Sequence, residues 1–148
     1  MLKNFYQNSF TLIELLLVVG ILALMAGMSM PALRTYQASF EVNSLGRDLA
    51  VDLRYAQQKS VTEQVNHAVV FDDADTYSIV KKGTPDEIIE TKNLSSGIDF
   101  YEVNFSGDYA EFNSCGAAKE SGNVVIKDNT GKTLTIEVRP SGFIRVID

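Results

Sequence analysis

The hydrophobic pattern divides the 148-residue chain into three parts. From Phe10 to Met30 most residues are apolar, and Glu14 is the one ionisable side chain. About 20 apolar residues, at 1.5 Å rise per residue, are enough for a helix to cross the hydrocarbon core of a membrane. The first part therefore predicts a transmembrane helix over residues 10–31, after a short polar leader over residues 1–9.

The second part, after Pro31, has the period of an amphipathic helix. Its apolar positions are separated by 3, 4, 4 and 3 residues, which places them on one helix face. They are Val42, Leu45, Leu49, Leu53 and Ala56, and Leu33, Tyr36 and Phe40 extend the stripe toward Pro31. Because Pro31 lacks an N–H group and clashes with the preceding turn, it predicts a kink and not a helix end. We expect one long helix over residues 10–64, with its first half in lipid and its second half packed on a sheet.

The third part, from His67 onward, alternates apolar and polar residues as half-buried strands do. Turn-forming clusters at 72–75 and 128–131 indicate two hairpins. The expected strands cover residues 67–71, 76–81, 87–91, 98–103, 124–127, 133–139 and 142–147. A long helix followed only by strands predicts an α+β fold with an antiparallel β-sheet head. No internal repeat or linker in the sequence indicates a second domain.

Charge limits the classes of function that fit this head. The chain has 13 Lys and Arg against 19 Asp and Glu, a net charge of −6. Beyond Pro31 there are 12 basic and 18 acidic residues, so the head alone carries the same net charge. An acidic surface repels polyphosphate, which disfavours broad nucleic-acid binding.

Catalytic and metal-binding chemistry has little support in the sequence. Cys115 is the only cysteine, so no intramolecular disulfide can form, and we expect a small buried or loop residue. His67 is the only histidine, and no Cys-His-Asp set, phosphate loop or metal-ligand spacing is present. Asp72, Asp73 and Asp75 offer carboxylates to Ca²⁺, but this ion needs about 6–8 oxygen ligands. A solvated turn is the better interpretation, and we expect no cofactor.

Four aromatic residues, Tyr101, Phe105, Tyr109 and Phe112, form an aromatic-rich region in the middle of the head. We interpret this region as a loop whose rings pack in or near the core. An exposed aromatic patch there would instead indicate a face for a partner.

Glu14 is the residue that the apolar run does not explain. A carboxylate deep in a bilayer costs roughly 2.5 kcal/mol or more, so it needs a purpose and a partner. An ordinary secretory signal would use Lys3 as its basic region and be cleaved near Ala26–Ala32. Its apolar region would normally have about 7–15 residues and no carboxylate. A plain signal anchor would leave Glu14 without a role.

A third alternative accounts for Glu14, the short leader and Pro31 together. The sequence Ser9-Phe10-Thr11-Leu12-Ile13-Glu14 resembles the class III signal of type IV pilins and pseudopilins. The resemblance implies that a prepilin peptidase cleaves between Ser9 and Phe10 and methylates the new N-terminus at Phe10. It also implies that Glu14 guides filament assembly by neutralising the N-terminal amine of a neighbouring subunit. The family usually has Gly before the cleavage point, where this chain has Ser9.

Two segments of the head narrow the resemblance to the GspH/FimT family of minor pseudopilins. Asp52-Leu53-Arg54-Tyr55-Ala56-Gln57-Gln58 is similar to the stretch that ends the family's helix before two small sheets. The tail Gly142-Phe143-Ile144-Arg145 matches the family's G-R-(I/V)-R strand except at Phe143. Some relatives are proposed to bind DNA through a basic tail, and Phe143 and Asp148 argue against that activity here. The segment Tyr55–Gln58 also resembles minor pseudopilins of Gram-positive competence systems.

The resemblance implies a structural subunit and not an enzyme. The chain would be a minor pseudopilin or minor pilin of a type II secretion pseudopilus or a type IV pilus, with residues 32–148 as its pilin-like head. It would cross the inner membrane once and hold the head outside the cytoplasm. Its partners would be the prepilin peptidase, other major and minor subunits, the inner-membrane assembly platform and secreted cargo. The alternative is a subunit of a competence pseudopilus that takes part in DNA uptake.

Overall fold

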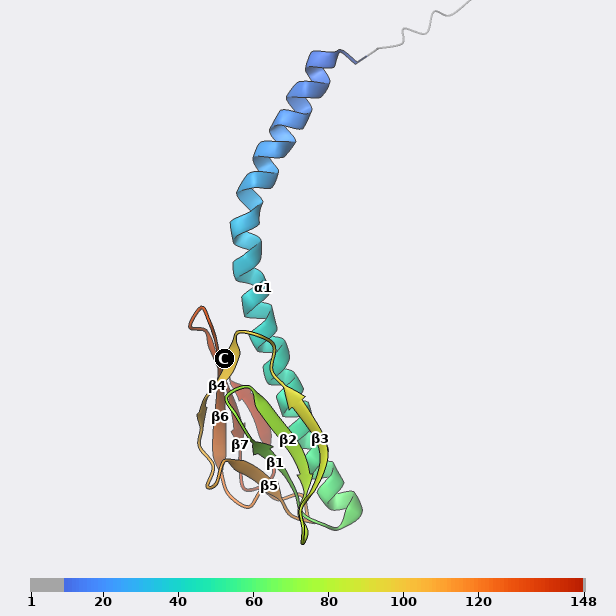
Figure 1. Cartoon of the computed structure of the whole chain (residues 1–148), viewed down its shortest axis with the longest axis vertical. Coiled ribbons are helices and arrows are strands. Elements are labelled where there is room, and N and C mark those ends of the chain that lie inside the picture. The colour runs from blue at the N-terminus through green and yellow to red at the C-terminus, as the bar shows by residue number, and fades with distance from the viewer. Residues whose placement is uncertain (1–9, 148) are drawn as a thin grey trace, which may run out of the picture. The chain divides into compact units, whose positions relative to one another are not determined.

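The computed structural model describes residues 10–147, with only the backbone described over residues 28–39. Over these residues one helix, α1 (Leu12–Glu63), precedes eight strands (Figure 1). The chain divides into two compact units, one ending at Gln37 and the other beginning at Ala38, and the second unit is the head. The expected long helix over residues 10–64 is confirmed to within two residues at each end.

Eight strands follow α1 and build the head. They are β1 (His67–Phe71), β2 (Thr76–Lys81), β3 (Glu87–Asn93), β4 (Ile98–Val103), β5 (Tyr109–Phe112), β6 (Gly122–Asp128), β7 (Thr133–Val138) and β8 (Ile144–Ile147). They form two antiparallel sheets with the strand orders β3-β2-β1-β5 and β4-β6-β7-β8. The expected α+β fold with one long helix and an antiparallel head is confirmed, and the head contains two sheets.

One strand lies where the sequence pattern predicted an aromatic loop. Tyr109–Phe112 is β5, which pairs with β1 at the edge of the first sheet. Its side chains alternate between half-buried and buried, with Ala110 and Phe112 pointing into the core. The pattern was missed because the strand has only four residues and one of its two inward positions is an alanine. Phe112 and Phe105 are buried as expected, whereas Tyr101 is 63% exposed.

The last strand begins two residues later than its apolar pattern predicted. Gly142 has a φ of 79°, a left-handed conformation that glycine adopts without strain. Its N–H donates to the carbonyl of Arg139, and the N–H of Arg139 donates to the carbonyl of Phe143. These bonds close a turn over residues 139–143, so that β8 begins at Ile144.

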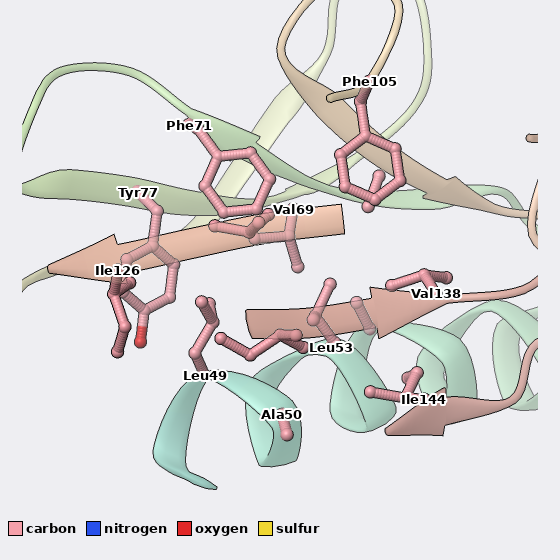
Figure 2. Close-up of a cluster of buried hydrophobic side chains, with 14 of the residues drawn as sticks. Leu49, Ala50, Leu53, Val69, Phe71, Tyr77, Phe105, Ile126, Val138 and Ile144 are labelled. Atoms are coloured by element: carbon pink, nitrogen blue, oxygen red, sulfur yellow. The ribbon is translucent and has the colours of Figure 1, made fainter. Parts of the chain in front are cut away.

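The apolar stripe of the second half of α1 is the centre of the core. Four of its five predicted members, Val42, Leu49, Leu53 and Ala56, are fully buried with 0% exposure, as expected. The fifth, Leu45, is partly buried and packs against the core. Figure 2 shows Leu49 and Leu53 pointing from α1 toward the strands. The partners from the sheets include Val69, Ile79, Phe112, Val124, Ile126, Leu134, Ile136 and Val138. Close approach also requires Gly46, because a Cβ there would meet the side chain of Leu134.

The predicted extension of this stripe toward Pro31 is wrong at Phe40. Its side chain is 80% exposed, so within the head the buried stripe begins at Val42. The side chains of Leu33 and Tyr36 lie outside the described residues, as does that of Pro31. The predicted kink at Pro31 therefore stays a prediction.

Aromatic rings join the two sheets to each other. Phe71 of β1 meets Phe100 of β4 edge to face, with 5.1 Å between ring centroids, and stacks with Phe105 at 6.3 Å. Tyr77 of β2 also meets Phe100 edge to face, at 6.0 Å. Pairs of this kind contribute about 0.5–1.5 kcal/mol beyond the area that they bury. The rings therefore connect the two sheets within the same core that α1 covers.

A buried carboxylate of α1 is paired with the first sheet. Asp52 is only 6% exposed. Its Oδ2 accepts a hydrogen bond of 2.6 Å from the Tyr77 hydroxyl, and its Oδ1 lies 2.7 Å from Nζ of Lys92. Burial and the neighbouring Asp52 carboxylate raise the pKa of Tyr77 far above its usual value, so the phenol stays protonated and donates. A buried charge is tolerated when it is paired and hydrogen-bonded, and both conditions hold for Asp52.

A second ion-pair cluster holds the end of α1. Glu63 lies in the last turn, where the helix dipole disfavours a negative charge. Its carboxylate accepts hydrogen bonds from Lys59 at 2.9 Å and from Lys81 of β2 at 2.8 Å. These two bonds, first that from Lys59, lower the pKa of Glu63 to about 2 from its usual 4.5. The cluster ties the end of the helix to the first sheet.

The buried stripe generates a stability prediction. Leu53→Ala should lower the free energy of unfolding by about 2–5 kcal/mol, because it removes buried methyl groups and leaves a cavity. Val51→Ala, at a neighbouring helix position that is 56% exposed, should change it by no more than about 0.5 kcal/mol. Chemical denaturation of the full chain in detergent micelles measures both. Equal effects of the two substitutions would contradict the assigned core.

The cluster at Glu63 generates a pH prediction. Because its pKa is lower in the folded chain than the usual 4.5, the ion pairs stabilise the fold above about pH 4.5. This stabilisation is lost as the pH falls from about 4.5 to about 2. The denaturation midpoint should therefore fall less steeply over that range in Glu63→Gln than in the wild type. Glu41→Gln, at an exposed position of α1, is the matched control and should keep the wild-type slope.

Candidate functional site

The first turn of α1 holds the residues that sequence analysis singled out at the N-terminus. Thr11 precedes the helix, and its Oγ1 accepts a hydrogen bond of 3.3 Å from the backbone N–H of Glu14. The carbonyl of Thr11 accepts bonds from the N–H groups of Glu14 at 3.1 Å and Leu15 at 3.2 Å. Thr11 is therefore the N-cap, and it satisfies donors that an uncapped helix end would leave unpaired.

Capping fixes the place of Glu14 in the helix. Thr11-Leu12-Ile13-Glu14 has the spacing of a capping box, with Glu14 as the third helical residue. A carboxylate in the first turn interacts favourably with the positive end of the helix dipole. The capping signal was present in the sequence, but sequence reasoning used Thr11 only as one residue of the motif from Ser9 to Glu14. Glu14 thus stands in a well-defined first turn, four residues after Phe10.

The surroundings of Glu14 are apolar on every side of the helix. All described side chains from Phe10 to Gly27 are exposed within the chain, and most are large and aliphatic. A Cβ placed on Gly20 or Gly27 would meet no atom within 4 Å. A helix that is apolar all round is one that is buried by something else, either lipid or other helices. Within the described chain every side chain from Phe10 to Gly27 stays exposed.

Several predicted functions fall at the boundary of the described residues. Ser9 and the rest of the leader lie outside them, whereas Phe10 is described and 75% exposed. Cleavage between Ser9 and Phe10 and methylation of Phe10 stay predictions. Over the residues that the structure describes, no helix has both the length and the hydropathy needed to cross a membrane.

The three aspartates proposed as weak Ca²⁺ candidates lie in the exposed turn between β1 and β2. Asp72 accepts a hydrogen bond of 2.6 Å from Ser78 Oγ, and Asp75 accepts one of 3.0 Å from Thr76 Oγ1. The N–H groups of Asp72 and Asp73 donate to the carbonyl of Thr76. Within the described part of the chain, no group of three or more His, Cys, Asp or Glu residues is arranged to hold a metal ion. The turn is built by its own hydrogen bonds.

The single cysteine and the single histidine occupy different environments. Cys115 is exposed in the turn after β5, where its N–H donates to Asn113 Oδ1 at 3.0 Å. His67 is buried at the start of β1, and its ring Nδ1 lies 2.8 Å from the carbonyl of Val65. The N–H of His67 donates to Ser60 Oγ, which joins β1 to α1. Both residues are therefore placed by backbone contacts.

The two head segments that carried the narrower resemblance contact each other. Gln57 Nε2 donates to the carbonyls of Gly116 at 2.6 Å and Gly142 at 3.0 Å. Arg54 Nη2 donates to the carbonyl of Ile144 at 3.2 Å. The segment Asp52–Gln58 of α1 therefore holds the start of the tail strand. Sequence reasoning found both segments but had no means to pair residues more than 80 positions apart.

Comparison with known proteins finds one match to the N-terminal segment and one to most of the chain. The model of the prokaryotic N-terminal methylation motif matches residues 4–30, which include Phe10 and Glu14. A fimbrial protein of Moraxella nonliquefaciens is 27% identical in an alignment 159 residues long, which covers 93% of this chain and 96% of that protein.

Two solved structures have the fold of the head. The minor pseudopilin EpsH from the type 2 secretion system of Vibrio cholerae matches with a TM-score of 0.62 and 11% identity, over 72% of this chain and 96% of EpsH. The type IV minor pilin FimU of Pseudomonas aeruginosa matches with a TM-score of 0.63 and 15% identity, over 76% of this chain and 92% of FimU. The chain thus combines a prepilin methylation motif with the fold of minor pilins and pseudopilins.

Proposed function

We propose that this chain is a structural subunit of a pilin-type filament: a minor pseudopilin of a type II secretion system or a minor pilin of a type IV pilus. The observation that carries the proposal is the position of Glu14. It lies in the capped first turn of α1, among exposed apolar side chains and within the matched methylation motif. The fold shared with EpsH and FimU supports the same assignment for the head. The role is assembly and contact, without a chemical reaction of its own.

The chemistry of the first turn explains how such a subunit enters a filament. Cleavage after Ser9 makes the amino group of Phe10 the new N-terminus, and methylation leaves it cationic. The Glu14 carboxylate of one subunit then neutralises the Phe10 amine of its neighbour. In a low dielectric either charge alone is heavily penalised, whereas the pair is strongly attractive. A bundle of like helices is therefore favoured over a single helix in lipid.

The same proposal places the chain in the cell. Residues 10–31 would anchor it in the inner membrane, and the head would lie outside the cytoplasm until the helix is drawn into the filament. The apolar side chains that nothing in the described chain covers would then be covered by lipid before assembly and by neighbouring helices after it. The prepilin peptidase, the assembly platform, other subunits and secreted cargo are the proposed partners.

The proposed function generates a prediction about processing of the N-terminus. Intact and peptide mass spectrometry of the protein from its native membrane should find an N-terminus at Phe10 with one added methyl group. Ser9 would then be an accepted residue at the cleavage site. An uncut N-terminus at Met1, or one near Ala32, would contradict the proposal, because the first indicates a permanent anchor and the second an ordinary secretory signal.

The proposed function also predicts the effect of removing the Glu14 charge. Glu14→Gln keeps the size of the side chain and should lower incorporation into filaments by about tenfold or more, since a desolvated ion pair contributes several kcal/mol. Glu14→Asp, which keeps the charge, should retain more incorporation than Glu14→Gln. Both variants should insert into membranes and fold normally. Quantitative immunoblotting of sheared filaments measures incorporation, and wild-type levels in Glu14→Gln would contradict the assigned role.

A further inference from the structure

A groove runs between the second half of α1 and the edge strand β8 of the second sheet. Its volume is about 530 Å³. Four residues of α1 and four at the tail line it: Arg47, Ala50, Val51 and Arg54, and Phe143, Ile144, Arg145 and Val146. Figure 2 shows Ala50 and Ile144 near each other at one end of the core. Every lining residue belongs to the head.

The groove is basic on a protein whose net charge is −6. Arg145 lies 2.9 Å from Glu137, which also pairs with Arg139 at 3.3 Å. Among the residues that the structure describes, Arg47 and Arg54 have no carboxylate partner. Arg54 uses one N–H on the carbonyl of Ile144 and has further donors to offer. The guanidinium groups of Arg47 and Arg54, which line the same groove, are therefore available to acidic groups of a partner.

The exposed apolar side chains of the groove and the open edge of β8 suit an extended peptide. Val51 and Phe143 are large apolar side chains with 56% and 54% exposure. The Arg139 N–H donates to the Phe143 carbonyl, so these two residues face each other as a hydrogen-bonded pair next to the β7–β8 ladder. In an antiparallel ladder, hydrogen-bonded pairs alternate with pairs that exchange no hydrogen bonds. Ile144 and Val146 are therefore in the non-bonded pairs, and their backbone N–H and C=O groups point away from β7. The bond from Arg54 to the Ile144 carbonyl confirms that side chains of α1 reach this edge. An extended segment with carboxylates and aliphatic side chains would satisfy both kinds of surface.

Nucleic acid is the poorer fit of the two anionic partners. A stable complex with a phosphate backbone needs several basic contacts, because affinity grows with the number of phosphates neutralised. Here the Glu137 carboxylate already pairs with two arginines and would repel phosphate. A short peptide with two carboxylates needs only Arg47 and Arg54.

The chain itself displays a segment of this chemistry on its other sheet. β3 is the edge strand of the first sheet, and Glu87, Ile88, Ile89 and Glu90 are all exposed on it. Ile88 is 66% exposed, which is high for an isoleucine in a strand. An open filament is built from heterologous contacts, in which one patch of a subunit meets a different patch of the next. A basic groove and an acidic apolar edge are two patches of that kind.

We propose that the groove between α1 and β8 binds an acidic, apolar edge strand from the head of a neighbouring filament subunit. Arg47 and Arg54 hold carboxylates of that strand, and Val51 and Phe143 pack against its aliphatic side chains. The inference rests on the proposed function, because it takes the neighbour to be another pilin-type subunit. The contact fixes which side of each head faces the next, a role that the N-terminal helix alone does not supply.

Direct binding is the first test. The probe is a labelled peptide with the sequence of residues 86–92 of this chain, capped at both ends, added to the full chain in detergent micelles. Fluorescence anisotropy should show binding that weakens by about tenfold or more in Arg47→Glu/Arg54→Glu, since two charge-assisted contacts are reversed. Lys119→Glu/Lys127→Glu makes the same change in net charge outside the groove and should bind as the wild type does. The peptide with glutamines at both glutamate positions should bind weakly to every variant.

Two results of that experiment would overturn the proposal. One is peptide affinity that is the same in the groove variant and in the lysine variant. The other is binding of a duplex DNA probe at physiological salt that the groove variant loses, because it would assign the groove to nucleic acid. Both readouts are independent of processing at Phe10, so a failure here is distinguishable from a failure of the proposed function.

A photocrosslinker at Val51 tests the neighbour in cells that make the filament. The peptide crosslinked to it, identified by mass spectrometry, should come from an exposed acidic strand of a subunit with a prepilin motif. The crosslink should be lost in Arg47→Glu/Arg54→Glu and kept in Lys119→Glu/Lys127→Glu. A crosslink to a helix or a neutral loop of the neighbour, or one that survives charge reversal, would overturn the proposed contact.

Discussion

Burial of one apolar stripe of α1 is the interaction on which the rest of the head depends. Val42, Leu49, Leu53 and Ala56 are completely buried, and both sheets contribute to their cover. Each sheet has four strands and would expose a large apolar face without the helix. Asp52 pairs with the first sheet and Arg54 with the second, on either side of Leu53. One helical turn therefore carries the apolar contact and the polar contacts that align the two sheets around it.

The first half of the same helix is subject to a different constraint. From Phe10 to Gly27 its side chains are mostly apolar on all faces, and all of them are exposed within the described chain. A helix segment without a polar face is typical of one that lipid or other helices surround. Against that background Glu14 is the single group that still requires a cation. Under the proposed function that cation would be the methylated amine of Phe10 on a neighbouring helix, and residues 4–30 match the prokaryotic N-terminal methylation motif.

Local pattern was enough for most of the fold. The long helix, its buried stripe and seven of the eight strands follow from periodicity and turn residues, because each is encoded within a short window. β5 was missed because Tyr109–Phe112 is short and has Ala110 as an inward residue. Phe40 was misplaced because periodicity says which face a residue is on and not where the sheet ends. The division into two sheets depends on pairing between distant strands, which no window reveals.

Prediction of the candidate site has the same limit, because a sequence pattern reveals neighbours along the chain and not contacts between distant residues. Phe10 and Glu14 were found from a contiguous motif, and the role of Thr11 as N-cap was legible in the spacing but was not used. The contacts of Gln57 and Arg54 with the tail are invisible in the sequence, since they join positions 85 and 90 residues apart. They place the tail beside α1, where residues 143–146 line the groove of the head.

Composition alone is a poor guide to how this head meets a partner. A net charge of −6 describes the average surface, yet four of the five arginines lie within the groove or beside it. The acidic residues Glu87 and Glu90 lie on an edge strand of the other sheet. Interactions between exposed charges decay over about 8–10 Å at physiological salt, so it is the local patch and not the total charge that a docking partner meets. Segregation of charge between two edges gives a subunit two unlike sides, and unlike sides are what a polar, open-ended filament requires of each subunit.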